Sequence, residues 1–180
     1  MIENNIASMF KFMTNIEKVL MNDEHLLRLL KYRPRGYDEE NQVEYLDPLD
    51  DRLPNVLDTS SDEYWRFVID RIRKGEKRIK LENDVKCFIY IHEGVDRSIF
   101  GNACVIEQEV VFGVYIHEEF ESDWRMSRIK DRLTHLLVHQ IEMAGYGKFE
   151  YIGGDLRDAT TGYRRIDYRY IFRTAKRRKY

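Results

Sequence analysis

The apolar positions in the first third of the chain follow helical spacing and then lose it. In residues 5–20, apolar side chains recur at intervals of three and four, which predicts an amphipathic helix. A second helix is predicted at residues 23–32, DEHLLRLLKY, where Asn22 or Asp23 can cap its start. From 33 to 60 the periodicity vanishes, and this stretch holds all three prolines of the chain. A loop of that length within a compact domain is usually functional, so we expect it to bind a partner or wrap a neighbour.

Helix and strand patterns follow one another downstream. A helix capped by Ser60 or Ser61 is predicted to end near Lys74 and Gly75. The β-branched and aromatic runs at 85–92 and 103–117 predict a hairpin that turns near residue 97. The pattern then predicts a helix from Ser122 or Asp123 to Ala144, followed by a closing hairpin with strands at 148–154 and 164–174.

This order predicts an α+β fold. N-terminal helices would precede an antiparallel β-sheet with a long hairpin, and one long helix would pack with them on one face of the sheet. A chain of 180 residues fits one core. We therefore divide a single domain into N-terminal helices at 1–32, an extended acidic and proline-containing loop at 33–60, and an α+β core at 61–180 with a basic C-terminal tail.

Composition and charge refine this picture. The chain is 43% hydrophobic and 34% charged, as in folded soluble proteins, and no apolar run or leader indicates a membrane or secretion. Residues 1–60 carry 7 Lys and Arg against 12 Asp and Glu, whereas residues 121–180 carry 14 against 8. A basic tail of this kind can bind nucleic acid or the acidic face of a neighbouring copy.

The tetrapeptide YIHE occurs twice and raises the possibility of a metal site formed by His92 and His117. Two histidines that share a zinc ion must lie within a few ångströms of each other. A hairpin that turns near residue 97 places His92 opposite residue 103, so that His117 lies on the order of 45 Å away. We therefore interpret both copies as strand ends, and we expect no shared metal.

Other candidate chemistry is weak. His135 and His139 have the spacing of zinc-protease helices, but the catalytic glutamate that should follow the first histidine is missing. Asp47, Asp50 and Asp51 lack the alternation of a calcium loop, and they are expected to supply turn and capping oxygens beside Pro48. No nucleophile motif or phosphate-binding loop is present, so we expect no enzyme, no catalytic residue, no metal and no cofactor.

Two alternatives stay open. A metal-dependent nucleic-acid enzyme could bring together Glu107, Glu109, Asp155 and Lys148 in the folded chain. A small nucleic-acid-binding module could instead use the basic C-terminal tail and its interleaved aromatic residues.

Two long stretches resemble known phage proteins. The apolar helix that runs into an acidic loop, DEHLLRLLKYRPRGYDEENQVEYLDPLDDRLPNVLD, looks like the N-terminal region of tailed-bacteriophage neck proteins. The order VVFGVYIHEEFESDWRMSRIKDRLTHLLVHQI and then KFEYIGGDLRDATTGYRRIDYRYIFRT is similar to the tail-terminator type of head-tail connector protein. The resemblance covers about residues 22–173 and lies in order and pattern, without a diagnostic motif.

The resemblance implies a structural virion protein without catalytic residues. Such a subunit is made in the host cytoplasm and forms a ring, usually a hexamer, that caps the tail tube and joins it to the neck proteins. DNA would pass through the ring, and no membrane would be involved. In a ring each subunit presents a different surface to each neighbour, and an acidic N-terminal third facing a basic C-terminal third favours this arrangement.

We predict contacts to neighbouring subunits or partners at ten residues. They are Tyr37, Tyr45, Asp47, Asp50, Asp51, His92, His117, Arg173, Arg177 and Arg178. His92 of one subunit would meet His117 or an acidic loop of the next, so that either His→Ala change would weaken assembly without unfolding the subunit.

Overall fold

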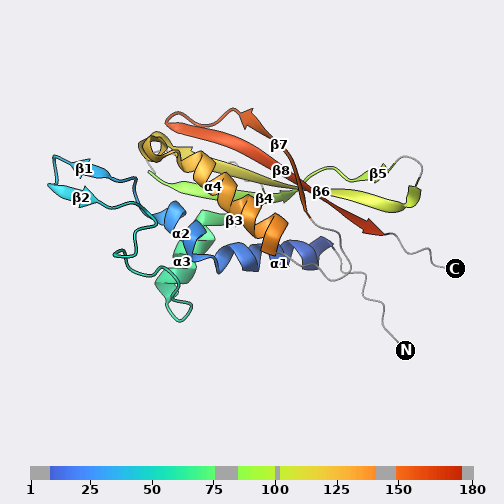
Figure 1. The fold of residues 1–180 in the computed structure, drawn as a ribbon, viewed down its shortest axis with the longest axis horizontal. Coiled ribbons are helices and arrows are strands. Elements are labelled where there is room, and N and C mark those ends of the chain that lie inside the picture. Colours follow the sequence, from blue (N-terminus) through green and yellow to red (C-terminus); the bar gives the residue numbers. More distant parts are fainter. Residues whose placement is uncertain (1–8, 76–84, 100–101, 141–148, 176–180) are drawn as a thin grey trace.

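Helices cover one face of a twisted sheet in the computed structural model, which describes residues 9–75, 85–99, 102–140 and 149–175 (Figure 1). The helices are α1 (Met9–Met21), α2 (Glu24–Lys31), α3 (Asp62–Arg71) and α4 (Arg125–Thr134), with the 3-10 helix η1 (Glu118–Asp123) and the π-helix η2 (His135–Gln140). The strands are β1 (Gly36–Asp38), β2 (Val43–Tyr45), β3 (Ile72–Lys74), β4 (Cys87–Glu93), β5 (Arg97–Ile99), β6 (Asn102–His117), β7 (Glu150–Arg157) and β8 (Tyr163–Ala175).

The main sheet confirms the α+β class but is not wholly antiparallel. Its strand order is β3-β4-β6-β8-β7, and β5 also pairs with β6. β3 runs parallel to β4, whereas the other neighbouring strands are antiparallel. The helix predicted to reach Lys74 ends at Arg71, because Ile72 adopts an extended conformation and pairs with Ile89. Ile72 is also buried, so tertiary packing decides its conformation.

The register of the long hairpin differs from the prediction. His92 lies opposite Val111 rather than residue 103. The chain does not turn near residue 97, since Arg97 pairs with Glu107 and the two strands continue to the pair Ile99 and Asn102. Pairing is interrupted after Glu93, where the Gly94 amide donates to the Glu109 carbonyl oxygen at 2.8 Å. Pairing resumes at Arg97, so the hairpin extends beyond the turn that the apolar pattern indicates.

The core lies between the helices and one sheet face, as predicted. Alternate residues of β4, β6 and β8 point to this face, and apolar side chains of all four α-helices pack on them. The central members from the strands are Cys87, Ile89, Ile91, Val110, Phe112, Val114, Ile116, Tyr168, Tyr170 and Phe172. Burying a large apolar side chain is worth about 1.5–3 kcal/mol, so this layer is the principal source of stability.

The second sheet face carries aromatic rings and ion pairs. Phe88, Tyr90 and Tyr115 form a small buried cluster, and Tyr163 packs against it. Charged side chains pair within β8 and across the neighbouring strands β6, β8 and β7. Asp167 pairs with Arg165 inside β8, and the pairs across strands are Asp167 with Arg157, and Arg169 with Glu109 and Asp155.

The helix predicted from Ser122 or Asp123 to Ala144 begins later. Residues 118–123 form η1, and Trp124 then takes a left-handed conformation with φ 59° before α4 starts at Arg125. After Thr134 the helix continues as the π-helix η2 to Gln140, and the predicted end at Ala144 lies outside the described residues.

The loop predicted at residues 33–60 contains a hairpin that the sequence reasoning missed. β1 and β2 pair antiparallel, with Gly36 opposite Tyr45 and Asp38 opposite Val43, and they form a sheet separate from the main one. We call residues 35–45 the arm, which extends from one end of the molecule (Figure 1). Later in the same loop, Val56 is buried in the core beside Leu49 and Leu57.

We expect Gly94→Ala to destabilise the fold. A Cβ atom at Gly94 would lie 2.6 Å from Cγ and 2.8 Å from Cβ of Glu109, which is buried. Relieving this overlap should lower the free energy of unfolding by about 1–3 kcal/mol, measured by urea denaturation. Gly36→Ala is the control, because a Cβ atom added there would meet nothing within 4 Å and stability should be nearly unchanged. Equal effects at both positions would contradict this packing.

Candidate interaction site: the arm and the arginine clasp

The arm is closed by hydrogen bonds around Asp38. Its carboxylate accepts from the backbone amides of Glu40 and Asn41, each at 3.1 Å, and from Nδ2 of Asn41 at 3.0 Å. The hydrogen bonds from Asn41 are the main cause that lowers the pKa of Asp38. Gln42 takes the left-handed conformation that reverses the chain, with φ 54°. The arm thus has a defined turn with an ionised carboxylate.

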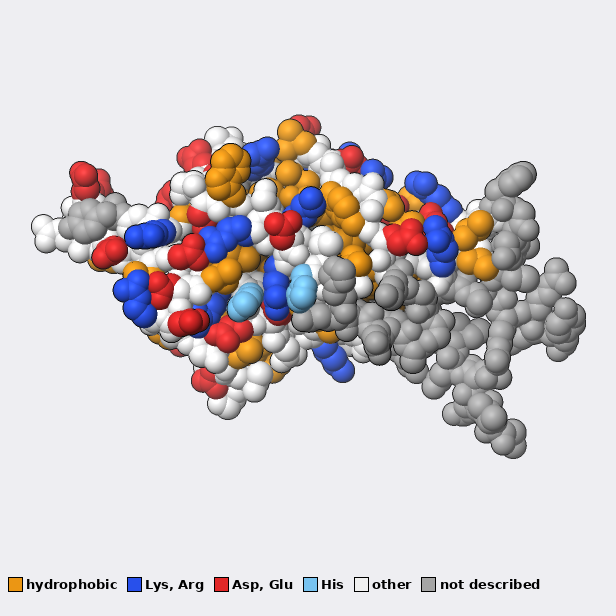
Figure 2. Space-filling view, in the orientation of Figure 1, with side chains coloured by type: hydrophobic (Ala, Val, Ile, Leu, Met, Phe, Trp, Pro, Cys, Tyr) orange, Lys and Arg blue, Asp and Glu red, His pale blue; other side chains and the backbone are white. Residues whose placement is uncertain are grey.

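The outer part of the arm lies in solvent. Glu39, Glu40 and Glu44 are exposed, and Val43 leaves 43% of its surface uncovered. Acidic side chains lie near the end of the arm in the space-filling view (Figure 2). An isolated two-stranded hairpin is at best marginally stable in water, so its position depends on how its base is fixed.

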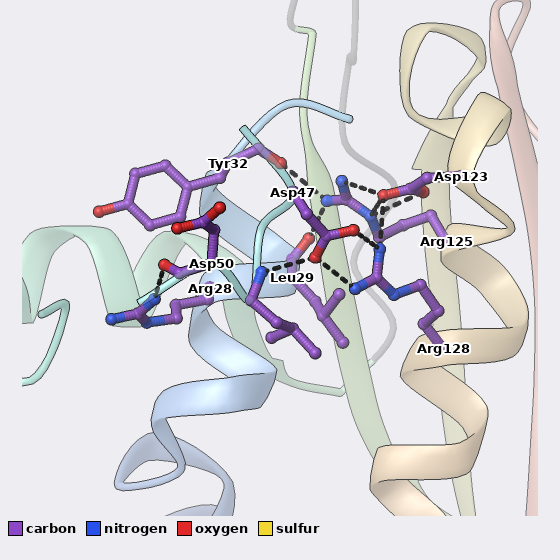
Figure 3. A network of polar contacts seen from close by, with 9 residues as sticks. Arg28, Leu29, Tyr32, Asp47, Asp50, Asp123, Arg125 and Arg128 are labelled. Atoms are coloured by element: carbon purple, nitrogen blue, oxygen red, sulfur yellow. Dashed lines mark hydrogen bonds and ion pairs between the residues drawn. The ribbon is translucent and has the colours of Figure 1, made fainter. Parts of the chain in front are cut away.

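Arginines of α4 fix that base. Arg125, Arg128 and Arg132 are spaced by three and four residues, so they share one side of the helix. We call these three arginines, with Asp23, Asp47 and Asp123, the arginine clasp. Figure 3 shows Arg125 and Arg128 of α4 pointing toward the end of α2 and the segment after the arm.

Arg125 is fully buried and satisfies the end of α2. Its Nη1 donates to the carbonyl oxygens of Leu29 and, at 2.8 Å, of Tyr32. Its Nη2 donates to Asp123 at 2.8 Å. The last carbonyl groups of a helix have no partner within the helix, and a cation near this end is favourable. Arg125 therefore joins α4 to the point where the chain leaves α2 for the arm.

Arg128 holds the chain where it returns from the arm. Its guanidinium donates to both carboxylate oxygens of Asp47, at 2.9 Å and 2.7 Å, a strong bidentate geometry. Asp47 Oδ1 also accepts from the Leu49 amide at 2.9 Å. The hydrogen bond from Arg128 is the main cause that lowers the pKa of Asp47.

The third arginine secures the start of α2. Arg132 donates to the two carboxylate oxygens of Asp23 at 2.8 Å and 2.5 Å. Asp23 caps α2, since its Oδ1 accepts from the Leu26 amide at 2.8 Å. Both ends of α2 are therefore held by one side of α4.

Further contacts tie the rest of the loop to α2. Arg28 donates to the carbonyl oxygens of Asp50 at 2.8 Å and Leu53 at 3.2 Å. The Tyr32 hydroxyl donates to the Pro54 carbonyl oxygen at 3.0 Å. The segment that follows the arm is thus fixed on the body of the protein.

Of the predicted contact residues, the three aspartates lie in this tied segment. The expected turn role of Asp47 and Asp50 is confirmed: Asp47 bonds the Leu49 amide, and Asp50 Oδ1 accepts from the Arg52 amide at 2.9 Å. Hydrogen bonds from Arg52 lower the pKa of Asp50 to about 2. Asp51 is exposed. Contacts of these three residues with a partner stay a prediction.

The two predicted tyrosines belong to the arm. Tyr37 lies in β1 opposite Glu44. Tyr45 lies in β2, where the Arg33 guanidinium sits 5.7 Å from the ring centre and the hydroxyl donates to Asp38 at 3.4 Å. Arg33 also pairs with Glu119 at 2.9 Å, which links the base of the arm to η1.

The histidines of the YIHE pair are closer than predicted but still apart. His92 lies opposite Val111, so His117 is six positions further along β6, about 20 Å away at 3.3 Å per residue. The predicted 45 Å was wrong because it rested on the wrong hairpin register. His117 Nδ1 accepts from the Glu119 amide at 3.3 Å, and its ring meets Tyr163 edge to face at 5.1 Å. Nδ1 of His92 is 3.2 Å from the Glu93 carbonyl oxygen.

The predicted basic contacts lie toward the end of β8. Arg173 pairs with Glu150 at 3.1 Å and with Glu107 at 3.5 Å, while Arg177 and Arg178 are outside the described residues. β8 starts beside His117 and ends beside Val105, so its last residue lies at the far end of the sheet from the arm (Figure 1).

The acids proposed for a metal-dependent enzyme face arginines. Glu109 and Asp155 both lie near Arg169, at 3.7 Å and 3.2 Å. Glu107 faces Arg173, and Lys148 is outside the described residues. Within the described ranges, no group of three or more His, Cys, Asp and Glu side chains could hold a metal ion. The geometry of these acids is that of an ion-pair ladder across strands.

Sequence reasoning missed the arginine clasp and Trp124. The spacing of Arg125, Arg128 and Arg132 was visible, but their acidic partners are mostly distant in sequence. Trp124 is 80% exposed and left-handed, which no periodicity reveals. None of the helices in the described part of the chain is long and apolar enough to cross a membrane.

The fold and the arm define an α+β protein that presents a fixed acidic projection. A family model described as YomW matches residues 23–174, and the chain belongs to this family. The family is named after a gene of a Bacillus phage or prophage, and the protein is accordingly phage-associated. The matched residues begin at Asp23, which caps the start of α2, and they include the arm, the arginine clasp and the main sheet. No curated protein matches the chain.

Arg125→Ala should destabilise the protein strongly. The change leaves the carbonyl groups of Leu29 and Tyr32 and the Asp123 carboxylate without their buried partner. Breaking a buried ion pair costs about 3–5 kcal/mol, measurable as a lower midpoint in urea. Arg52→Ala is the matched control, because Arg52 pairs with Asp50 in solvent at the surface and its loss should leave stability nearly unchanged. Similar losses in both variants would contradict a structural role specific to Arg125.

The Asp47–Arg128 pair should make stability dependent on pH. The folded-state pKa of Asp47 is lowered, so its contribution is present above the unfolded value of about 3.9 and is lost as pH falls through the folded value. The difference in urea midpoint between the native protein and Asp47→Asn should therefore be largest near neutral pH and shrink below about pH 4. Asp51→Asn removes an equal charge from the same loop, outside the clasp. A difference for Asp47→Asn that does not vary with pH would contradict the assignment.

Proposed function

We propose that the protein is a structural virion protein at the head-tail junction of a tailed phage. It would serve as a ring subunit of the tail-terminator type, without enzymatic activity. The observation that carries this proposal is the arm, whose base is fixed by the arginine clasp while its outer part has few contacts with the rest of the described chain. A rigidly mounted projection is suited to reaching a neighbouring subunit.

The charge distribution supports a contact from head to tail. Glu39, Glu40 and Glu44 of the arm are exposed and form no ion pair within the described residues. The last third of the chain carries 14 Lys and Arg against 8 Asp and Glu. An arm that binds a different surface of the next copy makes a heterologous contact, which produces a ring when the rotation closes. Opposite charges would speed the encounter and favour the correct orientation.

The proposed partners follow from this role. Copies of the same chain, six if the ring has the usual size of the tail-terminator type, would form the closed assembly, and tail-tube and neck proteins would bind its two sides. DNA would pass transiently through the ring. The protein would be made in the host cytoplasm and would remain in the virion.

The mass of the purified protein tests this proposal. We expect closed rings by native mass spectrometry and negative-stain electron microscopy. The outer part of the arm is exposed in the single chain, and in the proposed ring a second copy provides the surface that it binds. A strict monomer that cleaves DNA with magnesium would overturn the proposal in favour of an enzyme. A monomer that binds DNA in a salt-sensitive way would instead favour the nucleic-acid-binding module.

Removing charge from the arm should weaken the ring without unfolding the subunit. Glu39→Gln combined with Glu40→Gln removes two exposed charges, and such charges at an interface contribute up to about 1 kcal/mol each. We expect the protein concentration below which the ring dissociates to rise about three- to tenfold, measured by light scattering after size exclusion. Glu118→Gln with Asp158→Asn removes the same charge at exposed positions outside the arm and should have little effect. Equal weakening by both pairs would show that only net charge matters.

A further inference from the structure

A groove runs between α1, α3 and the free edge of the main sheet. It has a volume of about 660 Å³, and its walls include Met21, Trp65, Ile69, Ile72, Arg73 and Lys74. The hollow continues along α3 past Arg66 and Asp70. It includes no residue of the arm and none of the clasp.

The floor of the groove presents an unpaired strand edge. β3 is the last strand in the order of the main sheet and pairs only with β4 within the described part of the chain. The Ile72 amide already donates to the Val68 carbonyl oxygen, so the donors and acceptors that this edge offers come from the rest of Ile72–Lys74. Such an edge is the acceptor in recognition by strand addition, where the main chain supplies affinity and side chains supply specificity.

The α3 wall of the groove exposes large apolar side chains. Trp65 is 42% exposed and Ile69 is 62% exposed, and they lie four residues apart on the same side of the helix. The Trp65 indole donates to the Thr59 carbonyl oxygen at 3.0 Å, so the ring is held in place. A fixed aromatic ring beside an apolar hollow is typical of an interface anchor.

The charges around the groove favour an acidic occupant. Its walls carry Arg66, Arg73 and Lys74 against Glu17, Asp62 and Asp70. Arg71 and Lys86 add two cations beside Asp70, so the groove and its border together are net positive. Arg66 is exposed and forms no ion pair within the described residues. Lys74 pairs with Glu17, but its side chain is 70% exposed.

We infer that this groove binds the arm of a second copy of the chain. The inference rests on the proposed ring, and it specifies the surface that receives the arm. An arm strand of three residues would lie along the three residues of β3, with exposed Val43 against Trp65 and Ile69. The arm is acidic: residues 35–45 contain four Asp and Glu against one Arg, which complements the cations of the groove.

The two surfaces are different, so the contact is heterologous. Each subunit has one arm and one groove, and both are used in a closed ring. A variant that loses one surface keeps the other, which makes the contact testable by mixing. A two-fold dimer through one shared surface would not behave in this way.

Two single variants separate these surfaces. Val43→Asp alters the arm, and Ile69→Asp alters the groove; both positions are exposed, so the fold should survive, as circular dichroism will check. Each variant alone should lose the ring and run as a monomer. An equimolar mixture should form a dimer of one copy of each, through the intact groove of the first and the intact arm of the second. We expect ring stability to fall tenfold or more in each variant. We also expect the mixture of the two variants to form the mixed dimer.

Crosslinking gives a second measurement that does not depend on weakening the contact. Val43→Cys combined with Ile69→Cys should form disulfides between copies under mild oxidation of the native ring. Val43→Cys with Val95→Cys is the control, because Val95 is 57% exposed and lies outside the groove. Of the two native cysteines, Cys87 is buried, and Cys104→Ser in both variants removes the other. Equal crosslinking in both pairs would overturn the inference.

The outcomes distinguish the groove from the ring itself. If the native protein forms rings while either Asp variant also does, the arm does not occupy this groove, although the proposed function stands. If both variants are monomers and the mixture stays monomeric, the contact is not between arm and groove. A native protein that is monomeric under all conditions would remove both proposals.

Discussion

The guanidinium of Arg125 lies where the two parts of the molecule meet. It is fully buried, and its donors reach carbonyl groups at the end of α2 and the carboxylate of Asp123. Such a cation is stable in the interior only when every donor finds a partner, so the geometry around it is narrowly constrained. The position of α2 on α4 follows from this constraint, and the path of the chain toward the arm follows from α2.

The sheet and the loop are linked through the same helix. α4 packs its apolar side on the sheet with Ile129 and Leu133, while its arginines face α2 and Asp47. An amphipathic helix normally turns its polar side to water. Here that side binds another part of the chain, so α4 joins the apolar core on one side to a polar network on the other.

Elements with strong local patterns could be predicted from the sequence. The helix at 23–32 and the strands at 103–117 and 164–174 differ from the structure only at their ends. β1 and β2 were missed because three-residue strands leave no periodic signal, and β3 because Ile72 also fits the helical pattern before it. The hairpin register shifts between the pairs Glu93–Val110 and Arg97–Glu107, where Gly94 lies against Glu109, and apolar spacing does not encode such a shift.

The candidate site was predicted in part. The turn role of Asp47 and Asp50 was anticipated, whereas the functional role expected for the loop at 33–60 from its length and prolines stays a prediction. The partners of these aspartates were not, since Arg128 lies 81 residues from Asp47 and Arg28 lies 22 residues from Asp50. Pairings over such distances arise from the packing of the helices and have no local signature.

The orientation of the arm relative to the rest of the subunit constrains the geometry of any assembly in which the arm binds a neighbouring copy. In a ring with one contact per subunit, the angle between an arm and its own body determines the rotation from each copy to the next, and therefore how many copies close the circle. That angle is set inside a single chain by the hydrogen bonds from Arg125 to the Leu29 and Tyr32 carbonyl groups and by the pair Arg128–Asp47. The diameter of a central opening would then be encoded by side chains that never touch a neighbour.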